Sequence, residues 1–119
     1  MPKKNKIELC KTEDIPNGAC KGFSTDLDAN TQDIFIVNRD NKFYGYKNSC
    51  PHTGVNLNWQ PDVFMDFDDF YIQCAVHGAR FEVESGLCVW GPCNGLYLEE
   101  IKLEINNSKI ALVSACNNN

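Results

Sequence analysis

The two histidines of this 119-residue chain are its most constraining feature, because each lies within three positions of a cysteine. The first pair is Cys50-Pro51-His52, the second is Cys74-Ala75-Val76-His77, and the 21 residues from 53 to 73 separate them. Two thiolates and two imidazoles, supplied in pairs by two loops, make a four-ligand metal centre. We therefore predict that these residues bind metal, rather than being two buried cysteines and two ordinary histidines.

Two kinds of metal centre fit these ligands. Zinc would take all four in one tetrahedron, because it accepts both thiolate sulfur and imidazole nitrogen. A [2Fe–2S] cluster would divide them, with the thiolates on one iron and the imidazoles on the other. Structural zinc pairs usually have two to four residues between ligands, and the single proline of Cys50-Pro51-His52 departs from that spacing. Spacing thus favours the cluster without deciding the matter.

The rest of the chain is predicted to be mostly β, because polar and apolar residues alternate and no window has a sustained helical stripe. Turns are expected at 38–41, 84–86 and 106–108, where Asn, Asp and Gly supply left-handed backbone. A sandwich or small barrel of antiparallel sheets fits such short strands. The predicted strands are 6–11, 19–25, 33–38, 42–47, 70–74, 79–84, 96–105 and 109–114.

Two segments are predicted to be long irregular loops. Residues 49–69 are rich in Pro, Asn, Asp and Gly, and residues 86–95 hold three glycines, two cysteines and a proline around Trp90. Irregular loops of this kind inside a small domain tend to carry function. Both segments are therefore candidates for the surroundings of the metal centre.

Composition narrows the class of partner. Sixteen acidic against eleven basic residues give a net charge of −5 and a pI near 4.9, which opposes binding to nucleic acid or an anionic membrane. No apolar stretch resembles a signal peptide or membrane span, so we expect a cytoplasmic protein. Its seven cysteines are an odd number, which argues against a complete disulfide framework.

The ligand motifs resemble those of the Rieske [2Fe–2S] family, specifically small soluble Rieske ferredoxins and the small subunits of nitrite reductases. The resemblance rests on Cys50-Pro51-His52-Thr53-Gly54 and on the run from Cys74 to Phe81. Glu84-Ser85-Gly86 follows, and Gly91-Pro92-Cys93 stands where the family has a proline loop over the cluster. Glycines after both histidines suit tight loops whose N–H groups can point at sulfide.

The resemblance implies one [2Fe–2S] cluster, with Cys50 and Cys74 on the buried iron and His52 and His77 on the outer iron. It also implies an all-β, Rieske-like fold of three antiparallel sheets, in which a cluster-binding part is inserted in a base domain. We expect one Rieske domain over residues 1–116, with the cluster-binding part at about 48–95 and a frayed tail at 117–119.

Departures from the family pattern bear on the reduction potential. High-potential respiratory members carry a disulfide between the ligand loops, at positions that are Val55 and Val76 here. They also place a serine and a tyrosine, whose hydroxyls donate to cluster sulfur, where this chain has Ala79 and Phe81. Fewer donors stabilise the reduced cluster less, so the expected potential lies at the low end of the Rieske range.

The expected function is one-electron transfer from a reductase to a partner oxygenase or reductase, without a substrate site. Rieske oxygenases need two further histidines for a mononuclear iron, and this chain has only two in all. The alternatives are a small accessory subunit of a larger redox enzyme, as in nitrite reductase, or a zinc-stabilised interaction module. We expect a monomer or a transient complex with redox partner proteins.

Several other residues have two interpretations each. The segment 59–70 is an expected insertion, either an acidic and aromatic docking surface or, the favoured interpretation, a solvated turn with core aromatics. Cys88 and Cys93 are expected to pack as small apolar side chains rather than to pair with each other or act as redox thiols. Trp90 is expected in the core, and Arg80 either orients the second ligand loop through a carboxylate or lies on the surface. Cys10, Cys20 and Cys116 are interpreted as structural.

Overall fold

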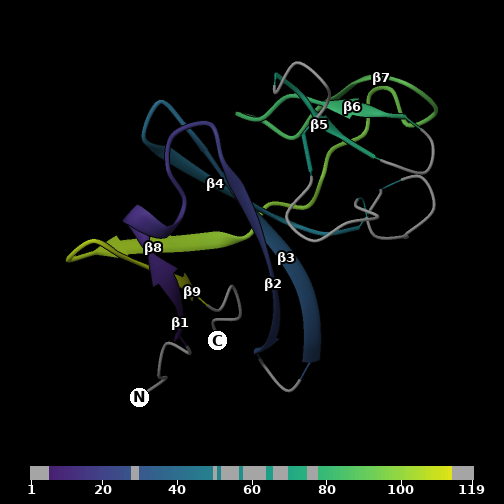
Figure 1. The fold of residues 1–119 in the computed structure, drawn as a ribbon. Coiled ribbons are helices and arrows are strands. Elements are labelled where there is room, and N and C mark those ends of the chain that lie inside the picture. The colour runs from purple at the N-terminus through teal and green to yellow at the C-terminus, as the bar shows by residue number, and fades with distance from the viewer. Residues whose placement is uncertain are drawn as a thin grey trace.

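The computed structural model describes residues 6–27, 30–49, 51, 57, 64–65, 70–74 and 78–113. The ordered elements are short strands and one 3₁₀ turn, and the structure is all-β as predicted (Figure 1). In chain order they are β1 (Lys6–Lys11), η1 (Thr12–Asp14), β2 (Cys20–Leu27), β3 (Asn30–Arg39), β4 (Lys42–Lys47), β5 (Ile72–Gln73), β6 (Arg80–Phe81), β7 (Cys88–Trp90), β8 (Lys102–Asn106) and β9 (Lys109–Val113).

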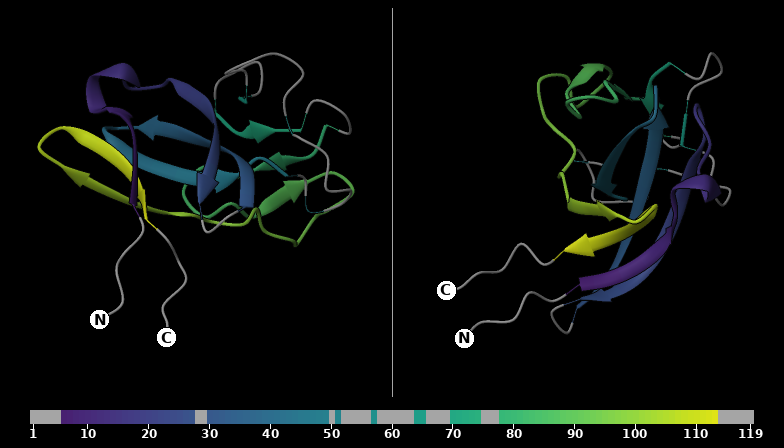
Figure 2. Two further views of the ribbon diagram at one scale, coloured as in Figure 1. Left: turned by 90° about the horizontal axis from the view of Figure 1, so that it is seen from below. Right: turned by 90° about the vertical axis from the view of Figure 1, so that its left-hand side faces the viewer.

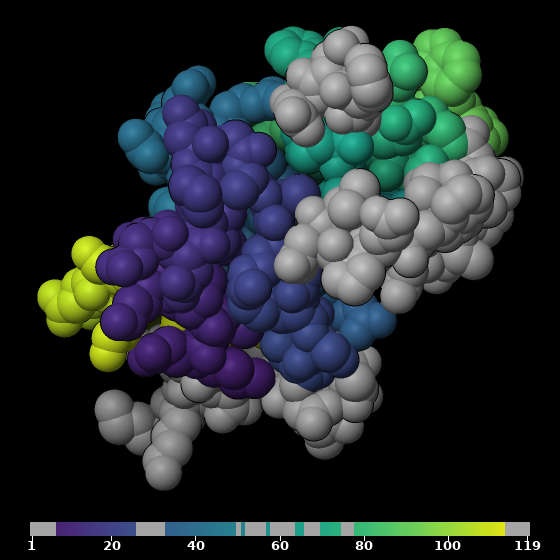
Figure 3. All heavy atoms as spheres, in the orientation of Figure 1, coloured from purple at the N-terminus to yellow at the C-terminus, as the bar shows by residue number. Residues whose placement is uncertain are grey.

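The strands form three antiparallel sheets of three strands each. The first has the order β1-β9-β8, the second β2-β3-β4 and the third β5-β6-β7. In sequence the third sheet lies between β4 and β8, and in space it occupies the end of the molecule opposite the β8–β9 turn (Figures 1 and 2). The space-filling view shows the same division, with the yellow β8–β9 turn and the green residues of β7 at opposite sides (Figure 3). The predicted inserted subdomain is thus built on a two-sheet base.

The two hairpin turns of the base adopt the left-handed backbone that the sequence predicts. Asp40 and Asn41 link β3 to β4 with φ of 55° and 63°, and Asn107 and Ser108 link β8 to β9 with φ of 52° and 62°. Two successive positive φ angles are the geometry of a type I′ turn, whose twist matches that of antiparallel strands. These short turns set the register of the β3–β4 and β8–β9 pairs.

The strand predictions are accurate in the base and poorer beside the predicted metal centre. Strands 6–11 and 42–47 have the predicted bounds, whereas β5 and β6 have two residues each. The strand predicted over 96–105 begins only at Lys102, because residues 97–100 cross from the third sheet to the base. They make single bridges, Tyr97 to Leu87 and Glu100 to Tyr46. Strand β7 lies inside a segment predicted to be irregular, because the glycines and proline of that segment mask a three-residue strand that pairs with β6 at two positions.

One buried cluster joins the base to the third sheet. Phe35 of β3 stacks on Phe64 with 4.4 Å between ring centroids, and both are fully buried with Ile72 and Phe81. Tyr46 of β4 donates its hydroxyl to the Val83 carbonyl at 2.6 Å. Burial, with smaller contributions from nearby acidic groups, raises the pKa of Tyr46 above its usual value. The third sheet is therefore fastened to the base by apolar packing and by a buried hydrogen bond.

Smaller apolar clusters hold the two base sheets together. Ile36 of β3 packs with Ile110 of β9 and with Ile15, and Ile34 packs with Leu112. Ile34 and Ile36 share one face of β3, and Phe35 and Val37 on its other face are buried in the cluster that joins the base to the third sheet, so both faces of β3 are covered. Within the described part of the chain, no helix has the length and apolar character needed to cross a bilayer.

Candidate metal centre

Of the four predicted ligands, Cys74 is the one that the structure describes; Cys50, His52 and His77 lie outside the described residues. Cys74 directly follows β5 and is 0% exposed. It belongs to the buried cluster that also contains Ile72 and Phe81. A thiol in such surroundings suits the buried iron of a cluster, since an apolar shell excludes water from metal-bound sulfur.

A tight loop links Cys74 to β6. The N–H of Gly78 donates to the Cys74 carbonyl at 2.8 Å, and the N–H of Cys74 donates to the Ala79 carbonyl at 2.8 Å. Gly78 has φ of +73°, the left-handed backbone predicted for the residue after His77. Residues 75–77, which include His77, lie outside the described part, and so does Gly54. The described ends show that this loop closes on itself at Cys74.

A buried asparagine closes the segment that contains the other two predicted ligands. Asn48 is 7% exposed and follows β4; its N–H donates to the Asp33 carbonyl at 2.8 Å. Its Oδ1 accepts the N–H of Leu57 at 2.6 Å, and Leu57 is fully buried. Asn48 thus brings together the two ends of segment 49–56, which contains Cys50 and His52. Asparagine commonly ties backbone in this way, but no sequence signal showed which N–H it would accept.

The covering loop, residues 91–95, packs against the second ligand loop. Gly91 has φ of +109°, and a Cβ at this position would lie 2.7 Å from Cα of Ala79. Pro92 follows directly, as expected for a proline loop over a cluster. The N–H of Gly95 donates to the Cys88 carbonyl at 3.0 Å, which closes the base of the loop.

The three loops converge on one buried core. Leu57 from the end of the first ligand loop, Cys74 and Ala79 from the second, and Cys88 and Cys93 beside the covering loop belong to a single cluster. The convergence brings a buried thiol, two glycine-dependent loops and apolar packing to one place. These features fit an iron–sulfur cluster whose buried iron is held by thiolates, because such a site requires fixed loops and an apolar shell.

The outward face of the third sheet carries a cation–π pair beside the second ligand loop. Arg80 of β6 pairs in register with Trp90 of β7, and its Cζ lies 5.5 Å from the centre of the indole ring. Trp90 is 58% exposed, so the expectation that it packs in the core is wrong. Cys88 and Trp90 are two positions apart, so regular alternation would place both on the same face of β7. The register of β7 against β6 shifts between the Cys88–Phe81 and Trp90–Arg80 pairs, and this irregularity accompanies the exposure of Trp90 beside buried Cys88. Arg80 therefore stacks on a surface aromatic.

The expected insertion is described only at a few positions. Phe64 is buried against Phe35, and Met65 bridges to Ile72, which agrees with the interpretation of core aromatics. Phe70 is 55% exposed and lies under the guanidinium of Arg39, whose Cζ is 5.0 Å from the ring centroid. Residues 58–63 and 66–69 lie outside the described part, so the proposed acidic surface stays a prediction.

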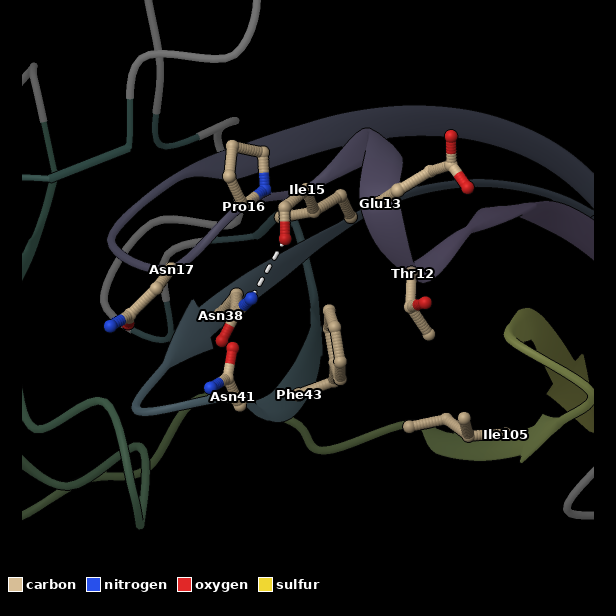
Figure 4. A pocket seen from close by; sticks show the side chains of 9 residues that line it. All are labelled: Thr12, Glu13, Ile15, Pro16, Asn17, Asn38, Asn41, Phe43 and Ile105. Carbon is tan, nitrogen blue, oxygen red and sulfur yellow. Dashed lines mark hydrogen bonds between the residues drawn. The ribbon is translucent and has the colours of Figure 1, made fainter.

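A pocket of about 670 Å³ lies in the base, where the η1 segment faces the β3–β4 turn (Figure 4). Asn38 donates its Nδ2 to the Ile15 carbonyl at 2.8 Å. The lining of the pocket also includes Asn41, Phe43 and Ile105. All of these residues come from the base, whereas Cys74 and the covering loop belong to the inserted part. The pocket is therefore separate in the sequence from the candidate metal centre.

Removing the side-chain acceptor of Asn48 is expected to loosen the first ligand loop. Asn48→Leu leaves the buried N–H of Leu57 without its partner, at a cost of about 1–3 kcal/mol. Asn48→Asp keeps an acceptor at the same position and is the matched control. Urea unfolding and iron content should both be affected more by the leucine than by the aspartate. Equal effects of the two substitutions would contradict the role given to Oδ1.

The fold and site define a small all-β protein with a candidate metal centre between loops, and known proteins of this kind identify its family. The family model of the Rieske [2Fe-2S] domain matches residues 5–103. The chain therefore belongs to the Rieske [2Fe–2S] domain family. This membership implies a single [2Fe–2S] cluster as its cofactor and makes zinc the wrong alternative for the metal centre.

Individual relatives have low sequence identity to this chain. The chain is 24% identical over 106 residues to the ferredoxin component of the alkene monooxygenase system of Xanthobacter autotrophicus (strain ATCC BAA-1158 / Py2), covering 89% of this chain and 79% of that protein. The fold of this chain is similar to that of the ferredoxin of carbazole 1,9a-dioxygenase from Nocardioides aromaticivorans IC177. The TM-score is 0.70 at 19% identity, and the match covers 91% of this chain and 96% of that ferredoxin. A ferredoxin solved in complex with the oxygenase of carbazole 1,9a-dioxygenase gives a TM-score of 0.70 at 20% identity, with coverage of 90% and 91%.

Proposed function

We propose that this protein is a one-electron carrier that takes an electron from a reductase and passes it to an oxygenase. The observation that carries the proposal is the Rieske [2Fe–2S] domain match over residues 5–103. Both histidines of the chain are then assigned to the cluster, which leaves none for the mononuclear iron of an oxygenase. The names of its relatives support the choice of acceptor, because one is the ferredoxin component of a monooxygenase system and another was solved with an oxygenase.

Within this proposal, Cys50, His52, Cys74 and His77 hold the cluster, and the cluster supplies one-electron redox chemistry when bound. The chain's own residues position and shield it. Asn48 closes the first ligand segment, the Cys74–Ala79 hydrogen bond closes the second, and Gly91 lets the covering loop approach Ala79. We assign residues 1–116 to one domain, with the cluster-binding part at about 48–95, and place the carrier in the cytoplasm as a monomer that forms transient complexes.

The proposed path for the electron leaves on the side of the outer iron. Gly78, which follows His77, lies next to Trp90: a Cβ on Gly78 would be 3.6 Å from Cζ3 of the indole. Trp90 and Arg80 are of the residue types that dominate protein interfaces. An electron carrier needs its cluster close to the docked partner, so an exposed aromatic beside the second ligand loop supports docking at this end of the molecule.

The test of the proposed function is the content and spectroscopy of the purified protein. We expect two irons and two acid-labile sulfides per chain, a visible spectrum, and an anisotropic EPR signal with average g below the free-electron value after reduction. Reduction by a ferredoxin reductase and reoxidation by an oxygenase component would complete the test. A cluster that reduces and reoxidises only as part of a permanent complex would instead favour an accessory subunit.

The midpoint potential is expected near the low end of the Rieske range, about −150 mV against an upper limit of about +300 mV. The reason is the absence of hydroxyl donors at Ala79 and Phe81. Introducing them together, by Ala79→Ser and Phe81→Tyr, should raise the potential by about 40 mV for each hydrogen bond of about 1 kcal/mol. Protein-film voltammetry measures both proteins; a wild-type midpoint above zero would contradict the prediction.

A further inference from the structure

We propose that Cys88 and Cys93 are a reversible disulfide site that fastens the covering loop. Their Sγ atoms lie 3.1 Å apart, and each residue is 1% exposed. A disulfide bond has an S–S length of about 2.05 Å, so the sulfurs need to approach by about 1 Å. The sequence predicted both cysteines to pack as apolar side chains, and they do lie in the core cluster. Their contact adds a chemical possibility to that packing.

The backbone holds these two thiols face to face. Cys88 begins β7, and its N–H donates to the Leu96 carbonyl at 2.8 Å while its carbonyl accepts the N–H of Gly95 at 3.0 Å. Cys93 lies in the turn between Cys88 and Gly95, where the Cys93 carbonyl accepts the N–H of Leu96 at 2.8 Å. Both cysteines are therefore anchored by the same short set of hydrogen bonds. Thiols held in this way react with each other as an intramolecular pair, which favours an internal disulfide over one with an outside thiol.

Hydrogen bonds donated by the two thiols link the cysteine pair to Trp90 on the outward face of the third sheet. Cys93 Sγ donates to Cys88 Sγ, and Cys88 Sγ donates to the Trp90 carbonyl at 3.3 Å. Forming the disulfide removes both protons, so the Trp90 carbonyl loses this donor. The bond then links β7 directly to the loop that packs on Ala79. Oxidation should thus restrain the covering loop against the second ligand loop.

The chemistry needs a two-electron oxidant, and a peroxide serves. One thiolate attacks the O–O bond of hydrogen peroxide, which gives a sulfenic acid and hydroxide; the proton released by the thiol converts this hydroxide to water. The second thiol displaces the sulfenic oxygen as water, so that two thiols and one peroxide yield one disulfide and two waters. A dithiol reverses the reaction through a mixed disulfide. Because both sulfurs are buried, access requires local opening, and both directions should be slow.

The test is a thiol redox titration of the cluster-containing protein read by mass spectrometry. Anaerobic glutathione buffers of graded ratio, approached from both the reduced and oxidised sides, are quenched with acid and alkylated. Trypsin cleavage after Arg80 and Lys102 releases residues 81–102, which hold Cys88 and Cys93 and no other cysteine. Cys10 and Cys20 fall in the separate peptides 7–11 and 12–21, which serve as internal controls.

The expected result is that peptide 81–102 loses both alkyl labels and two hydrogens together as the buffer becomes oxidising. The internal disulfide should exceed the glutathione adduct of this peptide by about tenfold or more, because the fold preorganises the pair. In guanidinium chloride that preference should fall. Cys88→Ser and Cys93→Ser should each abolish the unlabelled peptide, whereas Cys10→Ser should leave it unchanged. Full labelling of both cysteines in every buffer, or glutathione adducts as the main product, would overturn the proposal.

Discussion

Cys74→Ser and His77→Ala are each expected to abolish the visible absorbance and the EPR signal of the cluster. Cys74 is fully buried and directly follows β5, so a serine oxygen there would offer a harder, poorer ligand in a site shielded from solvent. Cluster binding and local folding are linked, because the cluster binds the folded state alone. Its loss should therefore cost about 3 kcal/mol or more and lower Tm by about 10 °C or more.

The matched control for these substitutions is Cys10→Ser. Cys10 is half-buried on β1, in the base of the molecule, and burial raises the pKa of its thiol. Serine there should leave iron content, colour and the EPR signal at wild-type values. Iron and sulfide analysis with thermal unfolding measures all three variants. If the Cys74 and His77 variants kept wild-type colour and Tm, the ligand assignment would be wrong.

The sequence predicted the class of the molecule well because its signals are local. The alternation in β1 and β4 and the Asn-rich turns report geometry that neighbouring residues decide, and these predictions agree with the structure. The paired Cys and His motifs similarly predicted the family that the domain match shows. Such features need no knowledge of distant contacts.

The errors concern residues whose state is decided by distant contacts. Trp90 is expected in the core but is exposed, because its strand is three residues long and has an irregular register against β6, which no local pattern indicates. Residues 97–100 fall within the strand predicted over 96–105, yet they cross between sheets and make single bridges at Tyr97 and Glu100. Asn48 was not singled out, since its role depends on Leu57 returning to it after eight intervening residues. Each case requires the three-dimensional arrangement of the sheets.

Alanine substitutions at two glycines of the covering loop are expected to differ strongly in their effect on stability. The two glycines have similar backbone conformations but different surroundings. Gly91 and Gly95 have φ of +109° and +93°, so alanine at either position costs about 1–3 kcal/mol in backbone strain. A Cβ on Gly91 would also lie 2.7 Å from the Ala79 backbone, whereas a Cβ on Gly95 would have no described atom within 4 Å. Backbone cannot move aside as a side chain does. Gly91→Ala should therefore displace the loop from Ala79 and cost about 1–3 kcal/mol more than Gly95→Ala.

The comparison of these two variants tests the covering loop separately from the general cost of left-handed backbone. Urea unfolding gives the difference in stability, and the rate at which a ferrous chelator bleaches the reduced protein gives the protection of the cluster. We expect Gly95→Ala to bleach at close to the wild-type rate and Gly91→Ala to bleach at least about tenfold faster, as expected for a loss of about 1.4 kcal/mol in the opening free energy of the loop. Equal bleaching rates would mean that contact with Ala79 does not protect the cluster, and that the covering loop serves the stability of the fold alone.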